Sequence, residues 1–213
     1  MNKALRCAFF DLDNTLYPNS SGVMQAIGSR INRFMVERLD IKPEEVTKIR
    51  DDYLKIFGTT LNALRRFYDV DPDEYLNFVH DLPLHLHLQY DPELDRMLER
   101  MEFRKIIFTN ADAKHARRVL SLLGILRHFE SIIDIHTLDF VNKPGRRAYF
   151  KALEFASAGP EECLLVEDSI VNIIPAAELG MTTVLVREGP PRHGAHHHIR
   201  RITELVDLLD SIE

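Results

Sequence analysis

The sequence predicts an α/β fold: a doubly wound, mainly parallel sheet with an all-helical segment inserted after the first strand. Three observations support this prediction. Short apolar runs recur along the chain, helical patterns separate the later runs, and a long stretch after the first run shows helical periodicity alone. Apolar runs without alternation are typical of parallel strands, because both faces of such strands are buried.

Five apolar runs are predicted to form the strands of this sheet. Each run is short and almost free of polar residues, which favours a strand over a buried helix. The runs cover residues 7–10, 105–108, 132–135, 163–166 and 183–186.

Helices are predicted between the later strands. Residues 112–123 carry apolar side chains at helical spacing and are followed by Gly124, a common stop signal. Pro144 is suited to the first turn of a second helix, and a shorter third helix over 172–179 is predicted to end at Gly180. Strands that alternate with helices in this way build an open sheet through right-handed crossovers.

A long segment between the first two strands interrupts this alternation, since it shows helical stripes and no convincing strand. The stripes contain Met24, Ile27, Ile31, Phe34 and Met35, then Val46, Ile49, Tyr53 and Phe57, then Leu61, Leu64 and Tyr68, and last Tyr75, Phe78 and Val79. We predict a Rossmann-like catalytic core of residues 1–16 and 102–213 and a helical cap of residues 17–101. The cap is expected over the sheet edge where ligands bind in folds of this type.

The composition argues against several classes of function. A net charge of −6 disfavours a binder of nucleic acid polymers, which needs a basic face. No apolar run reaches the roughly 18 residues that span a bilayer, and Asp11 and Asp13 interrupt the first apolar stretch, which disfavours a signal peptide. Cys7 and Cys163 are expected to be buried thiols in a reducing compartment. We therefore expect a cytoplasmic protein that acts on a small molecule.

Polar residues lie at the ends of three predicted strands, and Lys143 lies between the third predicted strand and the helix that follows it. In chain order these residues are Asp11, Asp13, Thr109, Asn110, Lys143, Glu167 and Asp168. Because the carboxyl ends of parallel strands share one edge, we expect these side chains to converge there. Each residue taken alone is also explained by a turn, a helix cap or a solvated surface side chain. Their order and placement together favour a functional site.

This set of residue types suits phosphoryl transfer. Carboxylates bind Mg²⁺, which offsets the charge of a phosphate group. One carboxylate can attack phosphorus, and a second can protonate the leaving oxygen. A threonine hydroxyl, backbone amides and a lysine can hold the phosphoryl oxygens. The pattern therefore predicts a phosphatase-type site.

The same residues resemble the four signatures of the haloacid-dehalogenase-like (HAD) hydrolase superfamily. Residues 10–16 are similar to the first signature, 108–110 to the second, 143–144 to the third, and 166–169 with Asn172 to the fourth. The resemblance covers nearly the whole chain. It implies a Mg²⁺-dependent phosphatase that works through an aspartyl-phosphate intermediate.

The resemblance also implies a role for each catalytic residue. Asp11 would be the nucleophile, and Asp13 would act as general acid and then as general base. The phosphoryl group would be bound by Thr109, Asn110 and Lys143.

The implied metal site uses the same sheet edge. Mg²⁺ would lie between Asp11, the backbone carbonyl of Asp13, and Asp168. Glu167 stands where many members of the superfamily carry aspartate, and it would support the metal directly or through water.

Three further segments indicate a substrate class. Residues 11–18, 53–61 and 79–84 look like the pyrimidine 5′-nucleotidase branch of the superfamily. This resemblance implies a nucleoside monophosphate such as UMP or CMP as substrate. Three cap residues would then lie near the substrate, although helix packing explains them equally well: Tyr53, Gly58 and Thr59.

Several alternatives remain open at this point. A sugar-phosphate or phosphoglycolate phosphatase, or a phosphomutase of the same superfamily, would keep every catalytic residue. A dehalogenase is disfavoured because Asp13 is present. A receiver-type phospho-signalling module carries its acidic pair before the phosphorylated aspartate and has no long helical insert. A binding protein without turnover is disfavoured by the intact site.

Histidines gather near the end of the chain, at His193 and at His196, His197 and His198, and His85 and His87 flank Leu86 in the helical segment. Imidazole suits zinc or nickel, but no cysteine or acidic partner lies close to the C-terminal group. We therefore predict a solvated loop there, followed by a helix over residues 202–209 that packs on the sheet.

Overall fold

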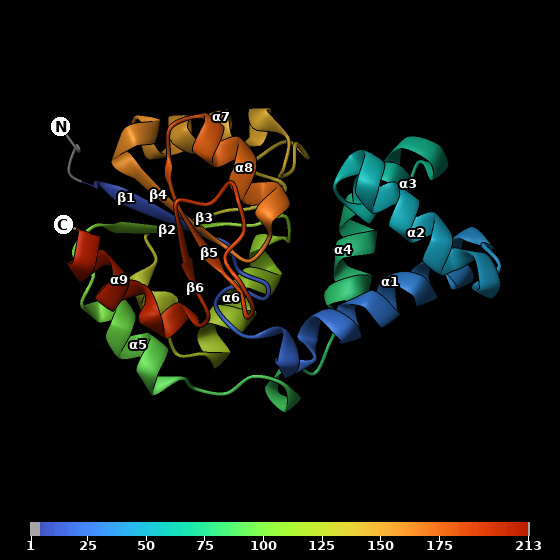
Figure 1. The fold of residues 1–213 in the computed structure, drawn as a ribbon. Helices are drawn as coiled ribbons and strands as arrows, with labels where there is room; N and C mark the ends of the chain where they lie inside the picture. Colours follow the sequence, from blue (N-terminus) through green and yellow to red (C-terminus); the bar gives the residue numbers. More distant parts are fainter. Residues whose placement is uncertain (1–4, 213) are drawn as a thin grey trace. The chain divides into compact units, whose positions relative to one another are not determined.

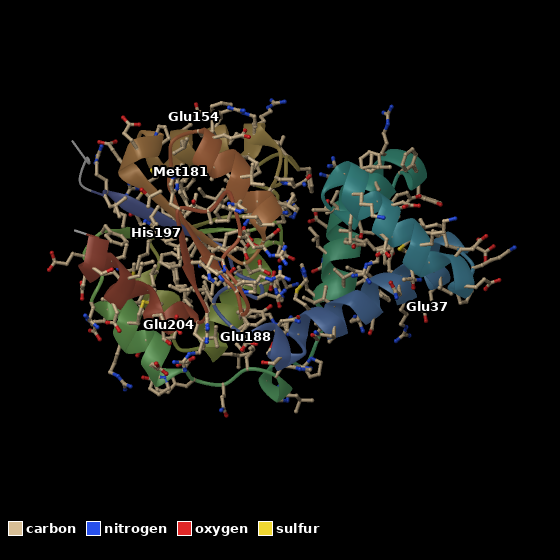
Figure 2. The ribbon with its side chains drawn as sticks, in the orientation of Figure 1. Glu37, Glu154, Met181, Glu188, His197 and Glu204 are labelled. Atoms are coloured by element: carbon tan, nitrogen blue, oxygen red, sulfur yellow. The ribbon has the colours of Figure 1, made fainter. Side chains whose placement is uncertain are left out.

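The structure, a computed structural model, describes residues 5–212 (Figure 1). Its contacts divide the chain into two compact units: Met1–Asn19 with Leu88–Glu213, and Ser20–His87. Figure 2 shows that side chains fill the space between the sheet and the helices of the first unit. The catalytic and cap roles predicted for the two parts, with boundaries at residues 17 and 101, stay predictions.

The first unit contains a parallel sheet whose order places β1 near its centre. Within residues 5–212 the sheet has six strands in the order β3-β2-β1-β4-β5-β6, and every neighbouring pair is parallel. The strands are β1 Cys7–Phe10, β2 Arg104–Phe108, β3 Ser131–Ile133, β4 Cys163–Glu167, β5 Thr182–Val186 and β6 His197–Ile199. The chain extends the sheet from β1 in one direction and then continues from β4 in the other. The carboxyl ends of β1 and β4 therefore flank the switch point, where such sheets bind ligands.

Helices cover both faces of this sheet (Figure 1). One face carries α7 (Arg146–Ala156) and α8 (Ile170–Glu178). The other face carries α5 (Pro92–Glu99), α6 (Ala113–Leu122) and α9 (Leu205–Ile212). Short 3₁₀ helices also occur along the described chain, at η1 Asn19–Ser21, η2 Leu84–Leu86, η3 Leu126–His128, η4 Pro160–Glu162 and η5 Ile202–Glu204. This three-layer arrangement buries both faces of the strands and explains their unbroken apolar runs.

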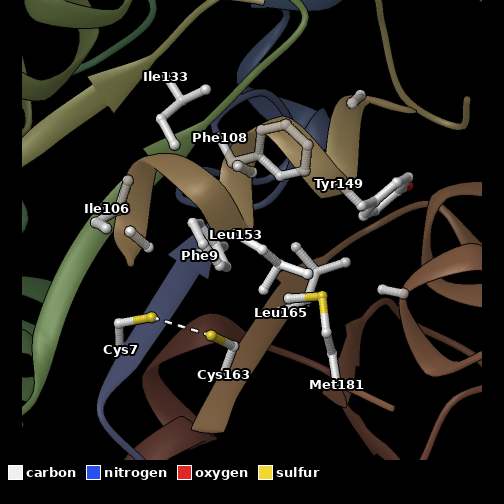
Figure 3. Packing of buried hydrophobic residues seen from close by; sticks show 14 of the residues in the cluster. Cys7, Phe9, Ile106, Phe108, Ile133, Tyr149, Leu153, Cys163, Leu165 and Met181 are labelled. Atoms are coloured by element: carbon white, nitrogen blue, oxygen red, sulfur yellow. Dashed lines mark hydrogen bonds between the residues drawn. The ribbon is translucent and has the colours of Figure 1, made fainter. Parts of the chain in front are cut away.

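The core between the sheet and α7 and α8 is built from alternate strand residues (Figure 3). Phe9 of β1 meets Phe108 of β2 edge to face at 5.9 Å, and Phe108 meets Tyr149 of α7 at 5.5 Å. Cys7 and Cys163 are opposite each other in the register of β1 and β4, and their sulfur atoms lie 3.2 Å apart as buried free thiols. The expected burial of both cysteines is confirmed.

The second unit, residues 20–87, is helical. Its helices are α1 Val23–Leu39, α2 Pro43–Phe57, α3 Thr60–Tyr68 and α4 Pro72–His80. Proline at the first turn suits α2 and α4, because the amides of that turn have no helical partner. Phe34 of α1 joins α4 through edge-to-face contacts with Tyr75 at 5.1 Å and Phe78 at 5.4 Å.

The predicted fold class is confirmed, and so are the five predicted strands, with one shortened. The third strand ends at Ile133 because Asp134 turns its carboxylate to local amides instead of continuing the strand. That carboxylate accepts hydrogen bonds from the backbone nitrogens of Ala113 at 2.9 Å and Thr137 at 2.9 Å. Pro144 lies two residues before α7, whose N-cap is Gly145.

The predicted solvated loop at the C-terminal histidines is wrong in part, because His197–Ile199 forms the edge strand β6. His197 is labelled in Figure 2. His196 fixes the start of this strand: its Nδ1 lies 2.9 Å from Thr183 Oγ1, and its backbone nitrogen donates to the same oxygen at 3.1 Å. The edge of β5 therefore supplies the partners that order this segment. In the described part of the chain, no helix is long and apolar enough to cross a membrane.

Candidate active site

Three carboxylates meet at the carboxyl ends of β1 and β4. Phe10 and Val166 are opposite each other in the register, so the residues that follow them are neighbours. The backbone nitrogen of Asp11 donates to the carbonyl of Val166 at 2.9 Å, which continues the ladder by one bond. One ligand oxygen from each of Asp11, Glu167 and Asp168 lies within 4.8 Å of the other two.

Lys143 places a buried ammonium group against two of these carboxylates. Its Nζ lies 2.7 Å from Asp11 Oδ1 and 2.7 Å from Glu167 Oε2, and it donates to the carbonyl of Phe108 at 2.8 Å. The side chain is 1% exposed. Each of the three ammonium protons therefore has an acceptor, as a buried lysine requires.

Asn110 holds the backbone of Lys143 in place. Its side-chain amide donates to the Lys143 carbonyl at 3.0 Å and accepts from the Lys143 backbone nitrogen at 2.9 Å. These two bonds tie the end of β2 to the segment before α7, so they fix where the ammonium group enters the site. Thr109 is buried beside it and its hydroxyl accepts from the backbone nitrogen of Ala111 at 3.0 Å. The phosphate-binding roles of Thr109 and Asn110 stay predictions.

Burial and mutual repulsion shift the acid–base equilibria of this cluster. Burial raises the pKa of Asp11 to about 7, and the charge of Glu167 adds to the rise. Burial likewise raises the pKa of Glu167, and burial with the charge of Asp11 raises the pKa of Asp168. For Lys143, burial alone would lower the pKa, but the charges of Asp11 and Glu167 outweigh it and raise the pKa above its usual range. One fixed cation thus faces three carboxyl groups, and the site favours additional positive charge.

The donor set fits a hard divalent cation. It consists of carboxylate oxygens alone, which suit Mg²⁺, Ca²⁺ or Mn²⁺ better than metals that prefer imidazole or thiolate. Within residues 5–212, no other group of three or more histidine, cysteine or acidic side chains has its ligand atoms close enough to hold a metal. The side chain of Asp13 is not part of this group, and its predicted contribution is a backbone carbonyl. The metal-ligand assignments stay predictions.

Asp13 and Asp11 each have hydrogen-bond partners that the sequence did not assign to the site. The Tyr17 hydroxyl donates to Asp13 Oδ1, and His115 Nε2 lies 3.1 Å from the same oxygen. Thr15 donates its hydroxyl proton to Asp11 Oδ2 at 3.0 Å. Burial, followed by the charge of Asp13, raises the pKa of Tyr17 above its usual range, so this hydroxyl keeps its proton at neutral pH. The one sequence signal for His115 was its place in the first turn of the helix after β2, near the carboxyl edge of the sheet.

The three residues predicted to contact the substrate from the cap lie in the second unit and have local roles there. The Tyr53 ring stacks on Phe67 with centroids 5.7 Å apart. Gly58 ends α2 at a φ of 74°, a left-handed conformation that favours glycine. Thr59 caps α3 by accepting from the backbone nitrogen of Asn62 at 3.2 Å. Their role in substrate specificity stays a prediction.

Comparison with known proteins connects this site to a family. The family model described as haloacid dehalogenase-like hydrolase matches residues 5–180. The chain is similar to Phosphate metabolism protein 8 of Saccharomyces cerevisiae, with 26% identity over 85% of this chain and 61% of that protein. The chain thus spans about three fifths of the length of that relative.

Two prokaryotic relatives are matched over most of their length. The putative pyrophosphatase PpaX of Clostridium perfringens is 23% identical over 98% of this chain and 99% of the relative. The glyceraldehyde 3-phosphate phosphatase of Methanopyrus kandleri is 26% identical over 87% of this chain and 85% of the relative. Among solved structures, a HAD phosphatase from Thermococcus onnurineus has a TM-score of 0.67 and 21% identity, with 96% of this chain and 98% of that chain covered. The structural likeness shows a shared fold.

Divalent cations are expected to stabilise the protein in a pH-dependent way. The folded pKa of Asp11, about 7, exceeds its ordinary value of 3.8, so in the cation-free protein this group lowers stability as pH rises through that window. A cation binds the ionised carboxylates and reverses that loss. After chelation, added MgCl₂ should therefore raise the thermal unfolding midpoint more at about pH 8 than at about pH 5.5. At a free Mg²⁺ concentration of 100 times Kd, the free energy of unfolding should rise by roughly 2.7 kcal/mol.

Asp168→Asn removes one predicted ligand and should reduce the shift caused by Mg²⁺ at about pH 8. Asp207→Asn, on the exposed surface, should leave the shift unchanged. An equal shift at both pH values, or none in the unmodified protein, would contradict the assignment of this cluster as the cation site.

Proposed function

Because this chain belongs to the haloacid dehalogenase-like hydrolases, we propose that it is a Mg²⁺-dependent phosphomonoesterase that works through an aspartyl-phosphate at Asp11. The observation that carries this proposal is the Lys143 ammonium group held between Asp11 and Glu167 at the switch point of the sheet. This arrangement places a nucleophile, a fixed cation and a set of oxygen ligands close together at one edge of the sheet. That combination is suited to a group whose charge is spread over several oxygens.

The activity that we propose is that of a phosphatase. The family of this chain consists of hydrolases, and relatives that the chain matches over most of their length carry phosphatase or pyrophosphatase names. The proposal adds the chemical steps, the cation and the substrate class. It also keeps a cytoplasmic location and a small phosphorylated molecule as the partner, as the sequence predicts.

The first step forms the covalent intermediate. An oxygen of the Asp11 carboxylate attacks phosphorus, and the bond between phosphorus and the leaving oxygen breaks. Asp13 gives its proton to that oxygen, so the leaving group departs as a neutral alcohol. Thr15, which donates to Asp11 Oδ2, and Lys143, at Oδ1, restrict the rotation of the nucleophile before attack.

The second step regenerates the enzyme. Asp13, now a carboxylate, takes a proton from a water molecule while the water oxygen attacks phosphorus. The bond between phosphorus and Asp11 breaks, and inorganic phosphate leaves. Throughout both steps the Lys143 charge stabilises the phosphoryl oxygens, together with the Thr109 hydroxyl and nearby backbone amides. A bound Mg²⁺, held by Asp11, Asp168 and Glu167, would supply further charge neutralisation.

For the substrate we propose a nucleoside 5′-monophosphate, with UMP and CMP as the first candidates. The support is the resemblance of residues 11–18, 53–61 and 79–84 to the pyrimidine 5′-nucleotidase branch. A sugar phosphate or phosphoglycolate is the second candidate, supported by the relative named glyceraldehyde 3-phosphate phosphatase. A phosphomutase would use the same catalytic residues. It would transfer the phosphoryl group without releasing free phosphate, which distinguishes it from both phosphatase candidates.

Asp11→Asn is expected to abolish turnover while the fold is kept. The change removes the attacking carboxylate but preserves the shape of the side chain, so phosphate release should fall by at least about 10³-fold with the thermal unfolding midpoint maintained. Phosphate release in the presence of Mg²⁺ is the measurement. Asp207→Asn is the control, since this exposed carboxylate pairs with Arg100 away from the sheet edge. Retained turnover in Asp11→Asn would refute the nucleophile assignment.

The nucleotide proposal predicts a preference between two matched substrates. The value of kcat/KM for UMP should exceed that for ribose 5-phosphate by at least about tenfold, which corresponds to about 1.4 kcal/mol from contacts with the base. A panel of CMP, AMP, NMN, phosphoglycolate and hexose phosphates extends the comparison. Equal values for UMP and ribose 5-phosphate would refute the nucleotide class and leave the phosphatase chemistry in place.

A further inference from the structure

Asp13 is contacted by two buried side chains that come from separate segments of the first unit. The Tyr17 hydroxyl donates to Asp13 Oδ1, and His115 Nε2 lies 3.1 Å from that same oxygen. Tyr17 is 3% exposed and His115 is 1% exposed, whereas the Asp13 side chain keeps 17% of its surface exposed. Two fixed groups thus hold a carboxyl group that remains accessible from the outside.

The turn after β1 brings Tyr17 back to Asp13. Asn14 has a φ of 64°, a left-handed conformation that asparagine tolerates better than most residues. The backbone nitrogens of Thr15 and Leu16 both donate to the Leu12 carbonyl, at 3.3 and 3.1 Å. This tight turn reverses the chain and places the tyrosine hydroxyl beside the carboxylate four residues earlier.

The start of α6 is fixed by two aspartates, and this fixes His115. The Asp112 carboxylate accepts from the His115 backbone nitrogen at 2.8 Å, and the Asp134 carboxylate accepts from the Ala113 backbone nitrogen at 2.9 Å. Side chains that cap the first turn satisfy its amides and define where the helix begins. The histidine ring therefore reaches Asp13 from a rigid element.

A purely structural explanation would be that two buried polar side chains needed a hydrogen-bond partner. That need does not account for their convergence on one oxygen of one carboxyl group, from a loop and from a helix. The carboxyl group that they share is also the one proposed to exchange a proton with substrate and water.

We propose that Tyr17 and His115 are positioning residues that hold the Asp13 carboxyl group in the orientation from which it protonates the leaving oxygen. The inference rests on the proposed function, in which Asp13 is the general acid. If the Asp13 carboxyl group rotated freely, it would spend less time pointing at the leaving oxygen, and the reaction would be slower. Small displacements of a catalytic group have large effects on the rate. Loss of one hydrogen bond to such a group should cost about tenfold in rate on the substrate that needs the proton.

Leaving-group dependence distinguishes positioning of the acid from a general loss of structure. An alkyl phosphate needs a proton on its leaving oxygen, whereas p-nitrophenyl phosphate releases a stabilised phenolate that needs it far less. The value of kcat/KM reports the steps through first phosphoryl transfer, so hydrolysis of the intermediate does not obscure the comparison. The measured quantity is the ratio of kcat/KM for p-nitrophenyl phosphate to that for the best alkyl phosphate.

Tyr17→Phe removes only the hydroxyl, and His115→Leu removes the ring nitrogen contact. Each should lower kcat/KM on the alkyl phosphate by about tenfold and on p-nitrophenyl phosphate by much less, so the ratio rises. His115→Gln keeps a side-chain N–H and should restore part of the loss. Asp13→Asn should change the ratio in the same direction by more, because it removes the acid itself.

Two matched controls separate this effect from the removal of a buried polar group. Tyr149→Phe deletes a buried hydroxyl that donates to the Asn172 carbonyl at 2.7 Å, in the same unit. His128→Gln alters a partly buried histidine whose Nε2 lies 2.6 Å from Asp95 Oδ1, a second histidine–aspartate pair. Both should leave the ratio at the wild-type value. Thermal unfolding of each variant shows whether it is folded, and Tyr17→Phe, the smallest change, carries the test if the histidine variants do not fold.

A folded Tyr17→Phe protein with an unchanged ratio would overturn the inference while leaving the proposed function standing. The inference is overturned as well if the controls shift the ratio as far as Tyr17→Phe does. If the wild-type protein releases no phosphate, or if Asp11→Asn retains full turnover, the proposed function fails and the inference fails with it. A raised ratio in Tyr17→Phe alone among the two tyrosine variants supports the inference.

Discussion

The contact on which the site depends is the buried ammonium group of Lys143 between the carboxylates of Asp11 and Glu167. A lysine that is 1% exposed is tolerable only when its charge is paired and its three protons are accepted. Here two carboxylates and the Phe108 carbonyl meet that requirement. Removing Lys143 would leave two buried carboxylates without a cation between them, so the residues of this group constrain one another. The same arrangement leaves more negative than positive charge, which makes the edge attractive to a cation.

The parallel sheet makes that contact available from distant parts of the sequence. β1 lies between β2 and β4 in the sheet. The residues that follow these three strands therefore lie side by side, although they are far apart in the sequence. Asn110 then links the end of β2 to the Lys143 backbone through a pair of hydrogen bonds. Rigid strands with buried faces thus hold short polar segments in place, and the chemistry depends on the ends of the elements more than on their interiors.

Much of this was accessible from the sequence because the relevant signals are local. Unbroken apolar runs predict the buried strands. The residues directly after two of them predict the grouping of Asp11 and Glu167, and the position of Lys143 between the third strand and its helix adds the lysine. The edge strand His197–Ile199 was not accessible, because its partners lie on β5 and its own residues resemble a polar loop. The contact of His115 with Asp13 depends on which way the first turn of α6 faces, and that is set by the carboxylates of Asp112 and Asp134. Tertiary context decided both features.

The helical unit Ser20–His87 contributes no strand to the sheet among the residues described, and every sheet register belongs to the other unit. The insert can therefore change its length or surface over evolutionary time without breaking a single bond of the ladder. Changes confined to this unit would leave Asp11, Lys143 and Glu167 in place, because these residues belong to the unit that contains the sheet. Two proteins that shared this sheet and differed only in this unit would therefore keep the same polar groups at its edge.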